Sequence, residues 1–283
     1  MALRKCPQLV LAKPDFALYT RNSKAFIAIC RRFAPVVEQV SIDECFLDMT
    51  GTGLLYPDPI AIAHTIKDTI LSELGFTVNV GIAPNKLLAK MASDFEKPNK
   101  VHTLFASEIP QKLWPLPVGE LFMVGRATTP KLQAMGIRTI GDLAKADPAF
   151  LIRKLGKQGG VLWQFANGKD AGVVSSTPAP NKGYSNAVTT PRDVTDFSYA
   201  DQVLLSLCET VGTRLRRDEQ AGSCLTIHLR TSAFENWSHQ RQLPNATNVT
   251  QELYAGAREL LRAAWDGKTP LRQIGIQITR LSD

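Results

Sequence analysis

The sequence predicts an α+β protein of several domains. The prediction rests on the spacing of apolar residues along the chain. This spacing changes twice, and each change marks a different combination of helices and strands. The first third alternates strand and helix patterns, and short helical stretches broken by glycines follow it. Strands and helices return after a small, Pro-containing segment at 173–183. A chain of 283 residues is long enough for two or three domains.

The first third has helices and strands in alternation. We expect helices at 23–33, 59–74 and 84–95, and strands at 36–49 and 77–82. The helix at 59–74 has the clearest amphipathic pattern, and Gly75 follows it as a stop. Elements in this order indicate one sheet with helices packed on it.

The rest of the chain divides into a helical unit and a small α/β unit. In the last hundred residues we expect helices at 200–217 and 250–265 and strands at 224–231 and 271–280. The sequence therefore predicts domains at 1–109, 110–172 and 184–283, with a linker at 173–183.

The charge distribution points to a polyanionic partner. The net charge is +7, and residues 110–180 hold nine Lys/Arg against four Asp/Glu, while each flanking part is at +1. A solvated surface explains a small overall excess about as well as nucleic acid does. A local excess in one short segment favours phosphate binding.

The cysteines and the apolar residues argue against several classes of protein. The five cysteines are scattered, odd in number and never spaced as CxxC. This argues against a zinc site and a disulfide framework, and favours a reducing compartment. No apolar run approaches the roughly 18 residues of a membrane span, and no secretion signal is recognisable. We therefore expect a cytoplasmic protein that has no membrane segment.

Three acids lie close together in an apolar stretch: Asp43, Glu44 and Asp48. An edge strand with its acids in water is one interpretation. The apolar neighbours favour a buried stretch, in which carboxylates must be paired or metal-bound. Asp43 and Glu44 serve one site only where the chain bends, as at the end of a hairpin. Converging carboxylates suit Mg²⁺ ions that promote in-line phosphoryl transfer.

The sequence around these acids, and a second run that follows it, resemble a known protein family. The chain reads VSIDECFLDMTG and then, after a predicted helix, TVNVGIAPNKLLAKMASDFEKPNK. Both runs resemble the palm of the Y-family (translesion) DNA polymerases, the bacterial DNA polymerase IV branch in particular, which carry SIDEAFLD and then VGIAxNKxLAKxASxxxKP. The resemblance continues in register along the chain. It implies a mixed-sheet palm at 1–109, a helix-hairpin-helix thumb at 110–172 and a little finger at 184–283.

The resemblance implies the roles of three residues. Asp43 corresponds to a metal ligand, and Glu44 to the second carboxylate, which the family treats as catalytic. A complete site is expected to hold two Mg²⁺ ions. Lys97 matches the lysine that contacts the triphosphate of the dNTP, where its charge offsets that of the leaving phosphates.

The helix at 84–95 carries a basic face. Lys86, Lys90 and Asp94 lie on it at i, i+4 and i+8. We expect Lys86 and Lys90 either to contact DNA or to belong to a solvated face that includes a Lys90–Asp94 pair, and the sequence leaves both interpretations open.

The helical segment resembles a helix-hairpin-helix that grips a DNA phosphate. Gly125, Arg126 and Thr128 occupy the predicted turn, and Lys131 follows. Backbone N–H groups at a helix N-terminus bind phosphate without reading the sequence. The family often has Gly-x-Gly at this turn, where this chain has Met123 as the first residue. Such hairpins also bind proteins, but the charge of the segment favours DNA.

The resemblance implies a Mg²⁺-dependent DNA-directed DNA polymerase that acts in DNA repair, damage tolerance and the SOS response. Its partners are primer–template DNA and dNTP, and we expect a monomer. A sliding clamp is a further partner in the family, through a tail that this chain does not show. The first palm strand, with its acidic motif, and the fingers are not recognised. We therefore expect a truncated form that is weakly active or inactive. The alternative is a non-catalytic DNA-binding or accessory protein on the same scaffold.

Overall fold

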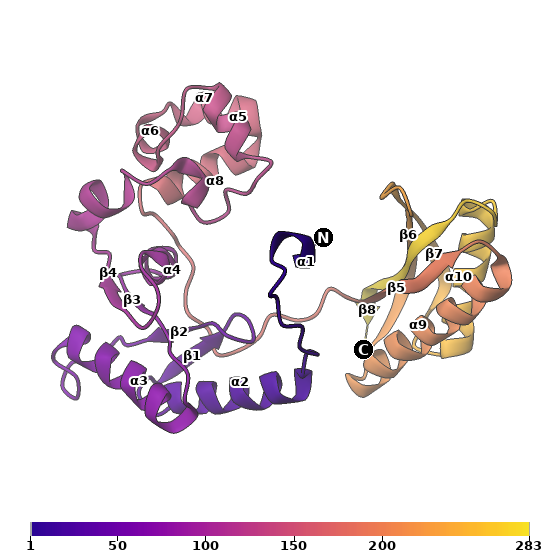
Figure 1. Ribbon diagram of the computed structural model, residues 1–283, viewed down its shortest axis with the longest axis horizontal. Coiled ribbons are helices and arrows are strands. Elements are labelled where there is room, and N and C mark those ends of the chain that lie inside the picture. The colour runs from indigo at the N-terminus through magenta and orange to yellow at the C-terminus, as the bar shows by residue number, and fades with distance from the viewer. Residues whose placement is uncertain (1, 283) are drawn as a thin grey trace. The chain divides into compact units, whose positions relative to one another are not determined.

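The computed structural model describes residues 2–282, which divide between Pro178 and Ala179 into two compact units (Figure 1). The division lies within the segment at 173–183 that the sequence predicts as a linker. Within the described residues, no helix is long and apolar enough to cross a bilayer.

The first unit opens with a short helix and two longer ones that pack together. These are α1 (Ala2–Lys5), α2 (Phe16–Cys30) and α3 (Pro59–Leu74). The α2 helix begins earlier than the predicted residue 23, because the Asp15 carboxylate caps it by accepting from the Leu18 amide at 2.9 Å. The α3 helix has its predicted bounds, with Asp58 as N-cap and Gly75 in a left-handed conformation (φ 75°) after its last turn. Isoleucines from both helices form one apolar cluster.

Two small sheets replace the single predicted sheet. Strands β1 (Val36–Gln39) and β2 (Cys45–Asp48) form an antiparallel hairpin. Strand β3 (Val80–Ile82) pairs in parallel with β4 (Val101–Thr103), a strand that the sequence did not predict. Among residues 2–282 these two pairs share no strand. The prediction was wrong because the stretch at 36–49 turns back on itself, so that β1 pairs with β2 instead of joining β3.

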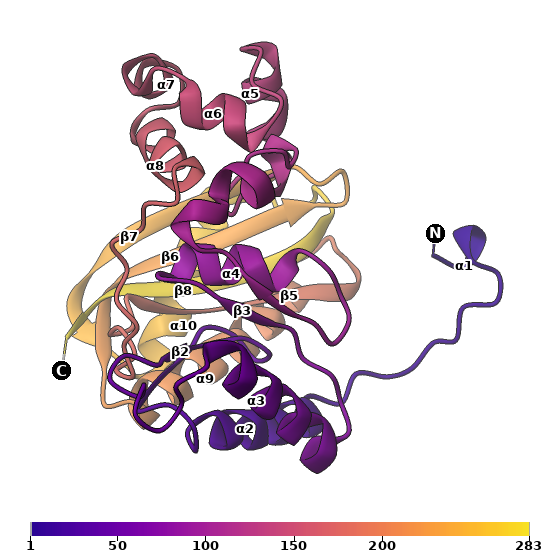
Figure 2. The same cartoon turned by 90° about the vertical axis from the view of Figure 1, so that its left-hand side faces the viewer.

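The α4 helix (Lys86–Asp94) leads into the helical part of the first unit. Its side chains Leu87, Leu88, Met91 and Ala92 lie in the same buried cluster as the helices that follow. The elements after β4 are the helical turns Ala106–Glu108, Ile109–Leu113 and Val118–Glu120, and the helices α5 (Thr129–Ala134), α6 (Ile140–Lys145), α7 (Pro148–Leu155) and α8 (Lys157–Ala166). The α4 helix (Figure 2) therefore packs its apolar face against this cluster.

The second unit is a four-stranded antiparallel sheet covered by two helices on one face. The strands β5 (Gly183–Val194), β6 (Ala221–Thr231), β7 (Asn236–Thr247) and β8 (Leu271–Ser282) lie in the order β5-β8-β6-β7. Helices α9 (Phe197–Arg217) and α10 (Thr250–Ala264) pack on the isoleucines and leucines of one sheet face. Strand β7 was not predicted, because polar residues separate Trp237 from Leu243 and its sequence lacks a regular alternation of apolar and polar residues.

Candidate active site and DNA-binding surfaces

The two acids of the motif lie in the turn that joins β1 to β2. The last paired residues are Gln39 and Cys45, and the amides of Val40 and Ser41 donate to the Glu44 carbonyl at 3.0 and 3.2 Å. The Ser41 hydroxyl donates to the Asp43 carboxylate at 2.6 Å. The chain thus bends at the point where one site for both acids requires a bend.

The turn is exposed, and the predicted burial of this stretch was wrong. Asp43 and Glu44 are exposed, Ile42 beside them is 49% exposed, and β2 is half-buried throughout. A two-stranded hairpin tip has no third strand or helix to cover it. The acids therefore face solvent, where phosphate and metal ions can reach them.

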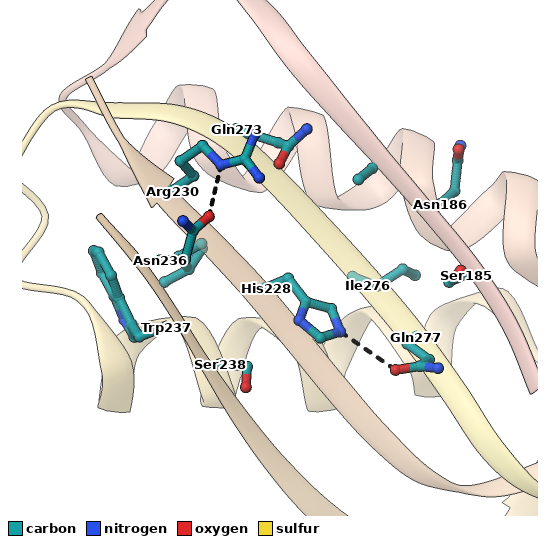
Figure 3. A pocket seen from close by; sticks show the side chains of 12 residues that line it. Ser185, Asn186, His228, Arg230, Asn236, Trp237, Ser238, Gln273, Ile276 and Gln277 are labelled. Atoms are coloured by element: carbon teal, nitrogen blue, oxygen red, sulfur yellow. Dashed lines mark hydrogen bonds between the residues drawn. The ribbon is translucent and has the colours of Figure 1, made fainter. Parts of the chain in front are cut away.

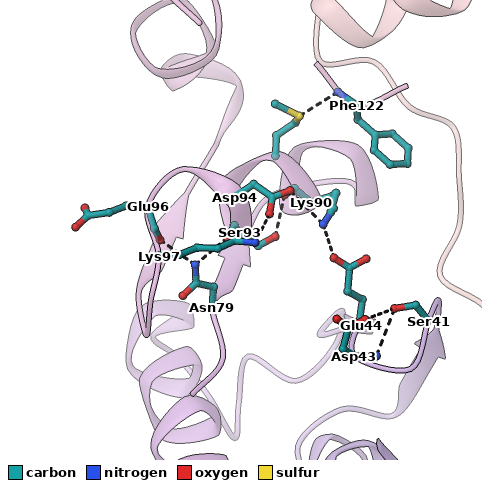
Figure 4. Close-up of polar contacts among 11 residues, drawn as sticks. Ser41, Asp43, Glu44, Asn79, Lys90, Ser93, Asp94, Glu96, Lys97 and Phe122 are labelled. Carbon is teal, nitrogen blue, oxygen red and sulfur yellow. Dashed lines mark hydrogen bonds and ion pairs between the residues drawn. The ribbon is translucent and has the colours of Figure 1, made fainter. Parts of the chain in front are cut away.

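A chain of alternating charges joins this turn to α4 (Figure 4). The Lys90 ammonium forms ion pairs with Glu44 and, at 3.1 Å, with Asp94. Lys97 reaches the other Asp94 oxygen at 2.8 Å. Spacing on the helix predicted the Lys90–Asp94 pair, but not Lys90–Glu44, whose partners lie on separate elements.

These contacts shift the pKa values of two groups. Partial burial would raise the pKa of Asp94, but hydrogen bonds from Lys97 and Lys90 outweigh it and lower the pKa below its ordinary value. Partial burial likewise opposes the charged form of Lys90, but Glu44 and Asp94 outweigh it and raise its pKa. Asp94 and Lys90 are therefore both charged at neutral pH.

A second ion pair joins α4 to the hairpin, one helical turn before Lys90. The Lys86 ammonium contacts both Glu38 oxygens at 3.0 Å and lies over the Phe46 ring, 5.6 Å from its centroid. Glu38 also accepts from the Ser175 amide at 2.8 Å. Burial alone would raise the pKa of Glu38, but the Ser175 amide and Lys86 lower it below its ordinary value. Lys86 thus turns toward β1, while Lys90 turns toward the carboxylate turn.

The acids of the turn meet part of the requirement for a metal site. Within residues 2–282, no group of three or more His, Cys, Asp or Glu side chains is arranged to hold a metal ion. Mg²⁺ commonly takes one or two carboxylates and obtains its other oxygens from water and phosphate. Asp43 and Glu44 are adjacent, exposed and purely oxygen donors, so they fit an ion that is shared with a phosphate.

The turn before α5 holds Gly125, Arg126 and Thr128, and α5 itself carries Lys131, the fourth thumb residue that the sequence assigns to DNA. Arg126 and Lys131 are exposed, and neither has an ion-pair partner among residues 2–282. The amides of Thr128 and Thr129 both donate to the Gly125 carbonyl at 3.0 Å. These two N–H groups are therefore used inside the turn, and phosphate binding by other backbone N–H groups of the turn stays a prediction. The two basic side chains remain for that contact.

Met123 adopts a backbone conformation that suits glycine. Its φ is +72°, in the left-handed region, and its side chain is 58% exposed. This is the position at which the sequence departs from Gly-x-Gly. A side chain with a Cβ costs roughly 1–2 kcal/mol in this region, so the turn keeps the glycine-type geometry without the glycine.

A polar hollow lies on the sheet face of the second unit that carries no helices (Figure 3). Its volume is about 460 Å³. His228 contacts the Gln277 side chain at 3.3 Å, and Arg230 donates to Asn236 at 2.6 Å. The lining includes hydroxyl, amide, imidazole and guanidinium groups but no carboxylate. Such a surface suits an anionic or hydrogen-bonding partner.

Comparison with known proteins assigns the family. The profile of the impB/mucB/samB family matches residues 1–94, its C-terminal domain matches 181–283, and the thumb domain of DNA polymerase-iota matches 120–170. DNA polymerase IV of Clostridium acetobutylicum is 42% identical over 280 residues, which are 99% of this chain and 70% of that protein. The chain belongs to the Y-family DNA polymerases of the DNA polymerase IV type.

Further matches agree with this assignment. DNA polymerase IV 2 of Bacillus subtilis is 38% identical over 289 residues, with 99% of this chain and 70% of that protein covered. Among solved structures, a Y-family DNA polymerase chimera matches with a TM-score of 0.87 at 23% identity, covering 99% of this chain and 80% of that one. The α+β multidomain fold class is therefore confirmed.

Replacing Glu38 tests the ion pair that joins β1 to α4 in this polymerase. We expect Glu38→Gln to lower the free energy of unfolding at pH 7 by about 1 kcal/mol, because charged hydrogen bonds to Lys86 and Ser175 are lost. The folded pKa of Glu38 is depressed, so its contribution is complete above the ordinary pKa of 4.5 and is lost as pH falls through the folded value. The difference between variant and parent should therefore shrink below pH 4.5 in denaturant titrations at several pH values.

The control is Glu73→Gln, which removes an exposed ion pair with Arg32. It should change stability by only a few tenths of a kcal/mol. Equal effects of the two variants would contradict the assignment of a special role to Glu38.

Replacing Met123 tests the strain in the thumb turn. We expect Met123→Gly to raise the free energy of unfolding by about 0.5–1 kcal/mol, because relief of the left-handed strain exceeds the chain-entropy cost of glycine. The matched control is Ala127→Gly, at an exposed turn residue whose φ is not positive. It should destabilise, so two changes of opposite sign are expected in thermal or denaturant unfolding. Destabilisation by both would refute the strain.

Proposed function

We propose that this protein is a template-directed DNA polymerase of the translesion type, and that the turn at Asp43 and Glu44 is part of its catalytic centre. One observation carries the proposal: two exposed carboxylates at a hairpin tip face a helix whose lysines lie beside them. Nucleotidyl transfer needs oxygen ligands for a metal ion next to cationic groups for phosphate, and this arrangement brings both together.

In this proposal Asp43 and Glu44 hold Mg²⁺, with two ions in a complete site. When bound, Mg²⁺ offsets the charge of the phosphates and favours ionisation of the attacking 3′-hydroxyl. The Asp43 orientation is fixed by the Ser41 hydroxyl, which donates to it at 2.6 Å. Lys97 lies at the far end of the charge chain, 61% exposed, where it is free to turn to the dNTP triphosphate.

We propose different roles for the two lysines of α4, Lys86 and Lys90. Lys90 holds Glu44 in place and becomes available to phosphate or DNA when a metal ion takes that carboxylate. The charge of Lys86 is balanced by Glu38, and its side chain is only 21% exposed. We therefore assign Lys86 to packing, in place of the direct DNA contact that the sequence suggested as one alternative.

The thumb and the second unit supply the DNA grip in this proposal. Arg126 and Lys131 contact the phosphate backbone from the turn that includes Gly125 and Thr128. The open sheet face around Arg230 and His228 adds polar contacts. We keep 1–109 as palm, 110–172 as thumb, 173–183 as linker and 184–283 as little finger as proposed boundaries.

We also propose the cellular setting in outline. The protein acts as a monomer in the cytoplasm during the SOS response to DNA damage. The odd number and scattered spacing of the five cysteines support a reducing compartment. A sliding clamp remains a proposed partner.

Primer extension tests the catalytic proposal. With Mg²⁺, dNTP and primer–template DNA, we expect Asp43→Asn and Glu44→Gln each to lower the extension rate by about 10²–10³, the usual loss when one electrostatic group of a transition state is removed. Both replacements keep the side-chain shape. The control is Glu96→Gln, which removes an acid that is 63% exposed in its ion pair with Lys100 and lies outside the carboxylate turn.

Two results would change the assignment. Extension that survives both replacements would exclude the turn as the catalytic centre. DNA binding without any Mg²⁺-dependent extension by the parent protein would favour the non-catalytic alternative for this chain.

Salt dependence tests the thumb contacts. We expect binding to primer–template DNA to weaken steeply between 50 and 200 mM salt, because each neutralised phosphate contributes about −0.9 to the slope of log K against log salt. Arg126→Ala with Lys131→Ala should make the slope shallower by about 1.8. The control pair Arg153→Ala with Lys154→Ala removes the same charge from α7 and should change the slope much less, as measured by fluorescence anisotropy. Equal changes in the two pairs would show general attraction rather than contact at this turn.

A further inference from the structure

Two cysteine sulfurs meet at the base of the carboxylate hairpin. Cys30 is the last residue of α2 and Cys45 the first residue of β2, and their Sγ atoms lie 3.8 Å apart. Both thiols are free. The family motif quoted above has alanine where this chain has Cys45, so the pair is a feature of this chain's own sequence.

The surroundings allow the two sulfurs to react. Cys30 is 1% exposed, whereas Cys45 is half-buried and can be reached from solvent. A disulfide bond has a sulfur–sulfur distance of about 2.05 Å. Rotation of the two side chains, with a small adjustment of the hairpin, brings the sulfurs together from their present contact. The three other cysteines lie elsewhere: Cys6 on the exposed segment after α1, and Cys208 and Cys224 in the second unit.

We propose that Cys30 and Cys45 are a modification site, at which a hydroperoxide forms a reversible disulfide between α2 and β2. This inference does not depend on the polymerase chemistry. It concerns the hairpin that carries Asp43 and Glu44.

The reaction balances with hydrogen peroxide as the oxidant. The sulfur of one of the two cysteines attacks one peroxide oxygen, the O–O bond breaks, and a sulfenic acid and one water form. The sulfur of the other cysteine then attacks the oxidised sulfur, the S–O bond breaks, and hydroxide leaves with the proton of the second thiol as a second water. Two thiols are oxidised by two electrons in total, and one peroxide is reduced to two waters.

The disulfide bond would close a loop of the chain between Cys30 and Cys45. Residues 30–45 contain β1 and the whole carboxylate turn. A cross-link at the ends of this loop restricts the unfolded chain and fixes the first residue of β2 against α2. The modification therefore stiffens the base of the hairpin next to Glu44, and a thiol reductant reverses it.

The test counts thiols and identifies the linked peptides. Cys6→Ser removes the exposed thiol and leaves four cysteines. After mild peroxide treatment and denaturation, we expect two reactive thiols per chain, and four again after dithiothreitol. Trypsin should release peptide 25–31 joined to peptide 33–67, two fragments that the sequence separates at Arg31 and Arg32. The oxidised protein should unfold several degrees higher than the reduced one.

The control is Cys6→Ser with Cys45→Ala, which introduces the residue of the family motif. It has three thiols, and we expect all three to survive the same treatment with no change in melting temperature. Four surviving thiols in Cys6→Ser would overturn the proposal. So would a linked pair other than these peptides, or a loss that dithiothreitol does not reverse, which would mean over-oxidation of single cysteines. An unchanged melting temperature in the linked protein would overturn the stiffening of the hairpin.

Discussion

The ion pair between Lys90 of α4 and Glu44 of the β1–β2 turn joins the two segments that form the candidate active site. Neither segment is a strong structure alone. Isolated two-stranded hairpins are marginally stable in water, and a helix of nine residues is shorter than an isolated helix requires. The Lys86–Glu38 ion pair joins the same helix to strand β1 of the hairpin. The acids and the lysines of the site therefore depend on each other for their positions.

The α4 helix can make these contacts because its opposite face is anchored. Leu88 and Met91 are buried in the cluster that includes the thumb helices, and this burial is the main source of stability for a short helix. The helical period then places the lysines on the face turned toward the hairpin. Thumb packing and the geometry of the candidate site thus depend on one amphipathic helix, and a cavity made under Leu88 would disturb both.

Local signals in the sequence predicted local structure well. The α3 helix has its predicted bounds because Asp58, Pro59 and Gly75 specify its start and stop within a few residues of chain. The spacing of Lys90 and Asp94 likewise predicted their ion pair. Pairing between strands is a long-range property, and the sequence did not show that β1 turns back onto β2 or that the three-residue β4 joins β3. The predicted burial of the carboxylate turn was wrong for the same reason, since apolar neighbours in sequence say nothing of what covers a hairpin tip.

The acids of the candidate site could be identified from the sequence. The ion pairs that balance their charge could not. Glu44 and Lys90 belong to elements that no sequence period relates, and only folding brings them together. In the proposed reaction Glu44 would exchange the Lys90 ammonium for a metal ion, which would cost part of the binding free energy. The Lys90 ammonium would then be available to a phosphate bound with the metal, and this contact would offset the one that is lost. A carboxylate held by lysine therefore favours joint binding of metal and nucleotide over binding of the metal alone, because only their joint arrival gives every charge a partner.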